Sequence, residues 1–118
     1  MARILLIDDD EMILELLTTF LEQAGHEAIT ACDGEEGMQL YHQEQPDLVV
    51  ADVMMSPKGG LSVIRELRID FPLAKIIAMS ADHPDVLKEA QVLGANYAFI
   101  KPFSVRELLE AANRLLEA

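Results

Sequence analysis

Residues 4–12 read ILLIDDDEM, so four consecutive apolar residues run directly into three aspartates and a glutamate. Residues that are apolar without alternation are typical of a strand buried on both faces, as in a parallel sheet. Carboxylates gathered at the end of such a strand repel one another. This stretch therefore predicts a buried strand and poses the question of what neutralises the acids that follow it.

Four further stretches have the length and composition of strands. They are HEAITA at 26–31, PDLVVA at 46–51, KIIAM at 75–79 and YAFI at 97–100. The first of these is the least apolar, but it contains the β-branched Ile29 and Thr30. Together with the opening stretch, these patterns predict five strands.

Helical patterns follow each of the five strands. An apolar stripe at helical spacing covers residues 13–24, and Gly25 is placed to end that helix. The other helices are predicted at about 33–44, from 63 to before Pro72, at 84–94 and at 104–116, with cap signals at Asp33, Pro84 and Ser104. Five strand–helix repeats predict a doubly wound α/β fold with a parallel sheet and helices on both of its faces.

Composition narrows the function classes. A chain of 118 residues, 51% of them apolar, predicts one domain spanning residues 1–118. The net charge of −12 argues against binding to nucleic acid or to anionic membrane surfaces. Cys32 is the only cysteine, no stretch is long enough to span a membrane, and the start is unlike a signal peptide. We therefore expect a cytoplasmic protein without an internal disulfide, in which Cys32 is a small core residue.

Polar residues end four of the predicted strands, namely Asp8 and Asp9, Asp52, Ser80 and Lys101. The carboxyl ends of parallel strands form one edge of the sheet, which is where ligands bind in such folds. The carboxylates suit a hard cation such as Mg²⁺, whereas Lys101 and Ser80 could hold an oxyanion that the metal also contacts. A carboxylate can itself attack phosphorus. The arrangement favours phosphoryl transfer to a carboxylate.

The chain resembles the response-regulator receiver domain of two-component signalling, as in the chemotaxis response regulator. The resemblance rests on LLIDDD, on PDLVVADVMM with Gly60 eight residues after Asp52, on IIAMSA and on GANYAFIKPF, which occur in this order on the predicted elements. It implies a flavodoxin-like fold with a five-stranded parallel sheet in the order 2-1-3-4-5 and five helices.

The resemblance also implies a metal site. Asp8 and Asp9 correspond to the acid pair that holds Mg²⁺, with Mn²⁺ as an alternative ion. Asp52 and the backbone carbonyl of Met54 would be further ligands. Asp10, by contrast, is expected to be a cap or a first-turn acid of the following helix rather than a metal ligand.

The phosphoryl site follows from the same resemblance. Asp52 would be the phosphoacceptor, Ser80 the switch hydroxyl that turns toward the phosphoryl group, and Lys101 the cation that pairs with a phosphoryl oxygen. The Lys101–Pro102 bond corresponds to the family's cis peptide.

Two positions depart from the family pattern. The family usually has an aromatic residue three positions before the lysine, where this chain has Ala98. Tyr97 and Phe99 flank it, but neighbouring strand residues point to opposite faces, so they cannot replace it directly. The family also has a proline four residues after the acceptor, where Ser56 stands here, followed by Pro57.

The resemblance implies a phosphorylation switch rather than an enzyme with an external substrate. It would at most catalyse its own phosphorylation and dephosphorylation. A histidine kinase or histidine phosphotransfer protein would supply the phosphoryl group, with the helix after Asp9 as the docking surface. A changed conformation of residues 83–117 would then control a downstream effector protein or domain, and a homodimer could form through the same residues.

Three other functions can be compared with this one. A small Mg²⁺-dependent phosphatase could use the same acids, but 118 residues leave little room for substrate recognition. An electron carrier of the flavodoxin type needs a phosphate-binding loop, and DDDEM would repel phosphate. An unphosphorylated interaction module would not need Asp8, Asp9, Asp52, Ser80 and Lys101.

Overall fold

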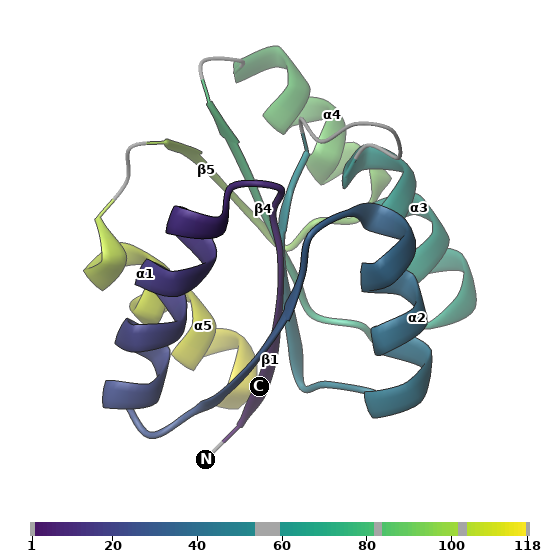
Figure 1. Ribbon diagram of the computed structural model, residues 1–118. Helices are drawn as coiled ribbons and strands as arrows, with labels where there is room; N and C mark the ends of the chain where they lie inside the picture. Colours follow the sequence, from purple (N-terminus) through teal and green to yellow (C-terminus); the bar gives the residue numbers. More distant parts are fainter. Residues whose placement is uncertain (1, 54–59, 82–83, 102–103, 118) are drawn as a thin grey trace.

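The computed structural model describes residues 2–53, 60–81, 84–101 and 104–117 (Figure 1). Within these residues five strands alternate with five helices, as the sequence predicts. The strands are β1 (Arg3–Ile7), β2 (Glu27–Ala31), β3 (Leu48–Asp52), β4 (Ile76–Ala81) and β5 (Tyr97–Lys101). The helices are α1 (Glu11–Gln23), α2 (Gly34–Glu44), α3 (Gly60–Asp70), α4 (Pro84–Leu93) and α5 (Val105–Glu117).

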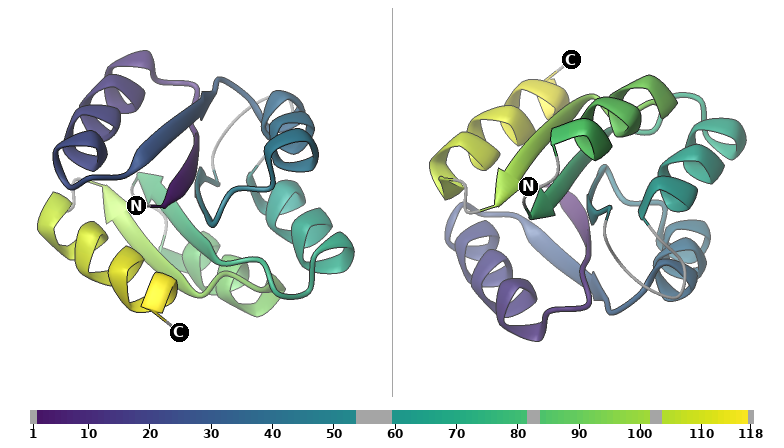
Figure 2. Two further views of the ribbon diagram at one scale, coloured as in Figure 1. Left: turned by 90° about the horizontal axis from the view of Figure 1, so that it is seen from below. Right: turned by 90° about the horizontal axis from the view of Figure 1, so that it is seen from above.

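The strands form one parallel sheet in the order β2-β1-β3-β4-β5, which confirms the expected topology. Helices α1 and α5 cover one face, and α2, α3 and α4 cover the other (Figures 1 and 2). Apolar side chains from alternate strand positions enter the two layers between sheet and helices. Since β1, β3 and β4 are covered on both faces, their residues are almost all apolar and buried.

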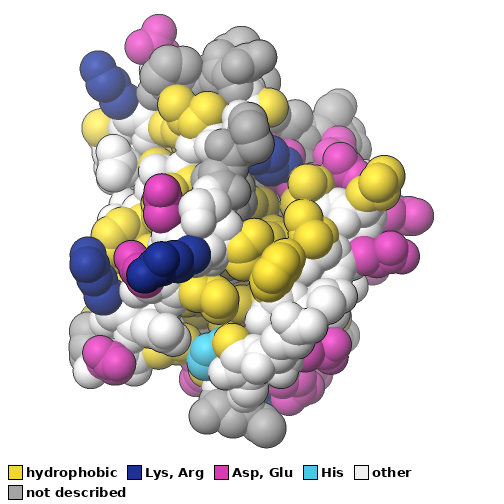
Figure 3. Space-filling model, turned by 90° about the vertical axis from the view of Figure 1, so that its left-hand side faces the viewer, with side chains coloured by type: hydrophobic (Ala, Val, Ile, Leu, Met, Phe, Trp, Pro, Cys, Tyr) yellow, Lys and Arg dark blue, Asp and Glu magenta, His cyan; other side chains and the backbone are white. Residues whose placement is uncertain are grey.

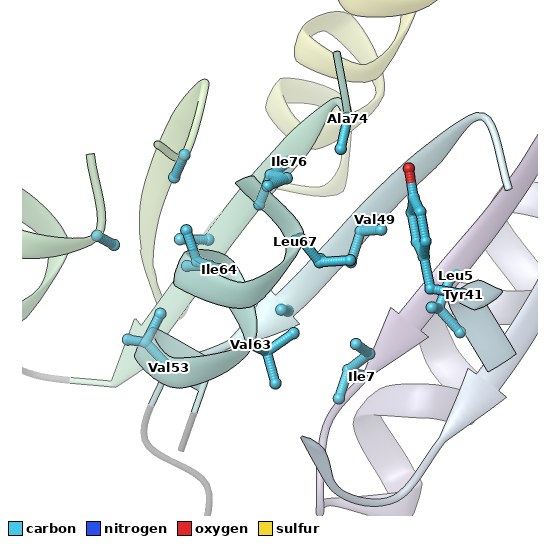
Figure 4. Packing of buried hydrophobic residues seen from close by; sticks show 14 of the residues in the cluster. Leu5, Ile7, Tyr41, Val49, Val53, Val63, Ile64, Leu67, Ala74 and Ile76 are labelled. Carbon is cyan, nitrogen blue, oxygen red and sulfur yellow. The ribbon is translucent and has the colours of Figure 1, made fainter. Parts of the chain in front are cut away.

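Figure 4 shows the packing on the α2, α3 and α4 face, where Val63, Ile64 and Leu67 of α3 lie against Val49 and Ile76 of the sheet. These five side chains are fully buried. At roughly 25 cal/mol per Å² of apolar surface, such burial is the main stabilising contribution to the fold. Among the described residues, no helix is both long enough and apolar enough to cross a membrane.

Helix ends lie where the cap signals place them. Asp10 caps α1 by accepting a hydrogen bond from the Met12 backbone, and Asp33 caps α2 through the Glu36 backbone. Gly25 and Gly94 follow α1 and α4 with φ of 87° and 130°, and each closes its helix with a Schellman pair of hydrogen bonds. These ends set the lengths of the connections that carry the chain back to the sheet.

One expectation is wrong. Cys32 is exposed rather than part of the core. It follows the last residue of β2, an edge strand, and its backbone N–H donates to the Glu36 carboxylate at the start of α2. It therefore lies in a surface connection beyond the reach of either core layer.

Candidate functional site

Three charged side chains at the ends of three strands meet at the carboxyl edge of the sheet. Lys101 Nζ lies 2.7 Å from Asp8 Oδ2 and 3.1 Å from Asp52 Oδ2. Because β4 lies between β3 and β5, the lysine must extend over the end of β4 to reach both acids. The structure thus brings together three of the residues that the sequence selected for the site.

Asp8 is the most enclosed of these residues, with 1% of its surface exposed. Its Oδ1 accepts a hydrogen bond of 2.9 Å from the Asp10 backbone, and its Oδ2 accepts the bond from Lys101. Burial raises the pKa of Asp8 above its ordinary value, although the hydrogen bonds from Lys101 and Asp10 oppose that rise. The nearby charge of Asp52 acts in the same direction as burial. A further positive charge would therefore be favourable beside Asp8.

Lys101 remains a cation in this environment. Burial by itself would lower its pKa, but the hydrogen bond to Asp8 and the charges of Asp52 and Asp8 outweigh burial, so the pKa is raised. One ammonium then faces two buried carboxylates. Among the described ion pairs, the two carboxylates carry one negative charge more than the lysine supplies.

A metal ion would supply the missing positive charge. Asp8, Asp9 and Asp52 each offer a carboxylate oxygen, and these oxygens lie within 4.8 Å of one another. Ligands about 2.1 Å from a Mg²⁺ ion are at most about 4.2 Å apart, so a small inward movement would complete three positions of an octahedron. Asp9 is exposed, which leaves room for the waters that Mg²⁺ retains. The donor set fits Mg²⁺. Met54, whose carbonyl is predicted as a further ligand, lies outside the described residues.

Ser80 is the last residue but one of β4, at the same edge, and is fully buried. Its hydroxyl donates to the Ala81 carbonyl over 3.5 Å, a distance at which a hydrogen bond is weak. Ser80 alternates with Met79, which packs on the α1 and α5 face. The serine side chain therefore lies on the opposite face of the sheet from Met79, and the hydrogen bond of its hydroxyl within the described residues is weak.

Ala98 packs with the buried cluster on the α2, α3 and α4 face, whereas Tyr97 and Phe99 pack with the cluster on the opposite face. This confirms that the two aromatic residues do not occupy the position of Ala98. Ile100 pairs in register with Ser80 and is 42% exposed. The side of β5 next to Ser80 thus presents Ala98 and Ile100. Pro102, whose peptide bond was expected to be cis, lies outside the described residues.

Gly60 makes a close contact at the site that its residue type alone does not predict. A β-carbon added to Gly60 would lie 2.1 Å from the Asp52 carbonyl oxygen, so α3 begins directly against the backbone of Asp52. Only glycine permits this approach. The sequence shows that Gly60 lies eight residues after Asp52. It does not show that the start of α3 contacts the Asp52 backbone, because that contact is tertiary.

The fold and this site define a class, namely α/β domains that carry a cluster of acids suited to a metal ion and a lysine at the carboxyl edge of a parallel sheet. Comparison with protein-family models makes the assignment specific: residues 4–113 match the response regulator receiver domain. The chain belongs to this family. Its function is that of a phosphorylation-dependent switch in two-component signalling.

Curated relatives agree with the assignment. The chain is 40% identical over 109 residues to the alkaline phosphatase synthesis transcriptional regulatory protein PhoP of Bacillus subtilis, covering 90% of this chain but 45% of that protein. It is 35% identical over 118 residues to the protein CcdB of Bacillus subtilis, covering 98% of both. The chain therefore spans less than half of the first relative and nearly all of the second.

Solved structures show the same fold. A response regulator receiver domain from Clostridium thermocellum has a TM-score of 0.94 at 28% identity, covering 99% of this chain and 95% of that one. The response regulator TrrA from Thermotoga maritima, solved in complex with Mg²⁺-BeF, has a TM-score of 0.90 at 34% identity, covering 98% and 99%.

Proposed function

We propose that Asp52 is the phosphoacceptor and that residues 1–118 act as a single receiver domain. The observation that carries this proposal is the position of the Asp52 carboxylate, beside Lys101 Nζ and within the group of three acids that fits Mg²⁺. Asp8, Asp9 and Asp52 would hold the ion, with the Met54 carbonyl as a further ligand. When bound, Mg²⁺ would neutralise the acids and the phosphoryl oxygens.

In the transfer step, an Asp52 oxygen attacks the phosphorus of a phosphohistidine on the donor protein. The new O–P bond forms as the P–N bond breaks, and the imidazole leaves with the electron pair and takes up a proton. Lys101 lies where its ammonium can pair with a phosphoryl oxygen as negative charge accumulates. Later attack by water on phosphorus returns Asp52 and releases phosphate.

The same charge provides the switch. A phosphoryl group on Asp52 adds negative charge and acceptor oxygens at the edge where Ser80 and Lys101 lie. The Ser80 hydroxyl, whose bond to the Ala81 carbonyl is weak, can turn toward those oxygens. This movement would change the surface formed by residues 83–117 and so reach a downstream effector protein or domain.

Partners follow from the same proposal. A histidine kinase or histidine phosphotransfer protein would dock on α1, where Met12 is 78% exposed and Leu16 48% exposed. Figure 3 shows hydrophobic side chains exposed on the side of the molecule that carries α1 and α5. The name of the PhoP relative suggests that the output controls transcription. A homodimer through residues 83–117 and a cytoplasmic location complete the proposal.

Beryllofluoride, a mimic of the phosphoryl group, tests the proposal directly. Amide NMR spectra would be recorded for the wild type, Asp52→Asn and Asp70→Asn with Mg²⁺ and beryllofluoride. Asp70 is an exposed aspartate at the end of α3 and is the matched control. We expect shifts around Asp52 and Ser80 in the wild type and in Asp70→Asn, but none in Asp52→Asn. Unchanged spectra in the wild type would contradict the proposal.

A further inference from the structure

Arg68 joins three segments of the chain at the amino-terminal edge of the sheet. It lies in the last turn of α3, and its Nη1 donates to the Pro72 carbonyl over 2.7 Å. Its Nη2 donates to the Gly94 carbonyl over 2.6 Å and lies 3.4 Å from Asn96 Oδ1. One guanidinium therefore links the α3–β4 connection to the α4–β5 connection, where Gly94 is 26 residues from Arg68 in sequence.

Arg68 holds the C-terminal end of α4. Gly94 and Ala95 both donate backbone hydrogen bonds to the Ala90 carbonyl, which closes the helix. A β-carbon on Gly94 would lie 2.7 Å from Arg68 Nε, so the arginine packs directly on this glycine. A cation at the C-terminus of a helix also interacts favourably with the helix dipole. Geometry and charge thus both favour the contact.

Asn96 extends the link into the sheet. Its Oδ1 accepts a hydrogen bond of 2.9 Å from the Ile76 backbone, and its own backbone N–H donates to the Ile76 carbonyl. Ile76 is the first residue of β4. Through Asn96, the end of α4 is tied to the start of β4 as well as to α3.

The N-terminal end of α4 lies at the opposite edge of the sheet from Arg68. β4 runs from Ile76 to Ala81, and α4 then returns from Pro84 to Leu93, so its first turn lies toward the edge that carries Ser80 (Figure 1). Among its described side chains, only Leu87 and Ala90 are buried. The helix is therefore tied at Gly94 and otherwise rests on an apolar contact made by Leu87 and Ala90, with the partly buried Val86 and Leu93 packed beside them.

We infer that Arg68 fixes the C-terminal end of α4, so that α4 pivots about Gly94 when the carboxyl edge changes on phosphorylation. This inference rests on the proposed function for the trigger, but the anchor itself does not. A helix of 10 residues is about 15 Å long, and a rotation of about 10° would move its first turn by about 2.6 Å while Gly94 stays in place. The movement would be largest near Ser80 and smallest beside Arg68.

Amide hydrogen exchange of the whole 118-residue protein tests the anchor, first without any phosphoryl mimic. In Arg68→Met we expect the bonded amides of Gly94, Ala95 and Asn96 to exchange at least about tenfold faster than in the wild type. Arg65→Met, an exposed arginine on the same helix, should change these rates less than twofold. Unchanged protection in Arg68→Met would overturn the inference. If Arg68→Met fails to fold, Arg68→Lys retains the charge without the planar fork, and it should show an intermediate loss; wild-type protection in that variant would count against the anchor.

Beryllofluoride with Mg²⁺ then tests the pivot. In the wild type, we expect changes in residues 86–89 and little change in residues 94–96, whereas in Arg68→Met the changes should extend to residues 94–96. Equal changes along the whole of wild-type α4 would overturn the pivot. An absence of change at Asp52 and Ser80 would instead contradict the proposed function and leave the result from the untreated protein standing.

Discussion

Replacing Lys101 with methionine removes the only ammonium that contacts Asp8 and Asp52 among the described ion pairs. Methionine retains an unbranched side chain, so packing changes little. Both carboxylates remain in place, with 1% of the Asp8 side chain and 10% of the Asp52 side chain exposed. Removing one partner of a buried ion pair typically costs about 3–5 kcal/mol.

The distances set the size of the effect. At an effective dielectric constant of about 20, Lys101 attracts Asp8 at 2.7 Å by about 6 kcal/mol and Asp52 at 3.1 Å by about 5 kcal/mol. Lys101→Met does not lose the whole of this attraction energy, because Asp8 can bind a proton when the ammonium is removed. Protonating a carboxyl whose ordinary pKa is about 3.9 costs about 4 kcal/mol at pH 7 and about 1.5 kcal/mol at pH 5. Those values limit the destabilisation at each pH.

The direction of the pH effect follows from proton binding. Without Lys101, the pKa of Asp8 in the folded protein lies further above its value in the unfolded chain. The folded variant then binds more protons than the unfolded variant, so its stability falls as pH rises from 5 to 7. Lys101→Met should therefore be less stable than the wild type by about 4 kcal/mol at pH 7 and by about 1.5 kcal/mol at pH 5.

Urea unfolding followed by circular dichroism, with EDTA present, measures both values. With a slope of about 1.5 kcal/mol per molar urea, the midpoint should fall by about 2.7 M at pH 7 and by about 1 M at pH 5. Lys88→Met, on an exposed lysine of α4, should change stability by less than about 0.5 kcal/mol. Adding Asp8→Asn to Lys101→Met should recover most of the loss at pH 7. The same loss at both pH values, or none, would refute the reasoning.

Three further predictions concern the metal, Gly60 and the α2 cap. If Mg²⁺ binds with a Kd of about 1 mM, then about 10 mM Mg²⁺ should stabilise the wild type by about 1.4 kcal/mol in urea unfolding, whereas Asp8→Asn should show little stabilisation; an equal response in the two proteins would place the ion elsewhere. Gly60→Ala should lose at least about 1–3 kcal/mol in the same assay, because its β-carbon would meet the Asp52 carbonyl oxygen; wild-type stability would show that α3 can shift freely. Asp33→Ala should lose about 1 kcal/mol with the hydrogen bond to Glu36, and an unchanged thermal midpoint would argue against that cap.

Much of the fold could be predicted because its signals are local. Consecutive apolar residues identify buried strands such as Leu48–Asp52, and Gly25 and Gly94 mark helix ends that require positive φ. The strand order came from the resemblance to a family rather than from periodicity. Gln45, which ends α2 with φ of 42°, gave no such signal, since its residue type does not favour that conformation.

The candidate site was predictable to the extent that it consists of strand ends. Asp8, Asp52 and Lys101 each follow an apolar run, and parallel strands bring their carboxyl ends to one edge. Contacts set by tertiary geometry could not be read in this way. The approach of Gly60 to Asp52 and the link from Arg68 to Gly94 depend on where helices lie after the chain has crossed the sheet. The prediction that Cys32 is a core residue is wrong because Cys32 follows β2, an edge strand. Its exposure depends on how far the helices cover that edge of the sheet.

The central claim, that Asp52 reversibly carries a phosphoryl group, is tested most directly by locating the modified residue. The protein would be incubated with acetyl phosphate and Mg²⁺, digested at acidic pH and mapped by mass spectrometry. We expect one phosphoryl group, on Asp52, in the presence of Mg²⁺ and none when EDTA replaces the metal. An unmodified protein, or a phosphoryl group on a different residue, would contradict the claim.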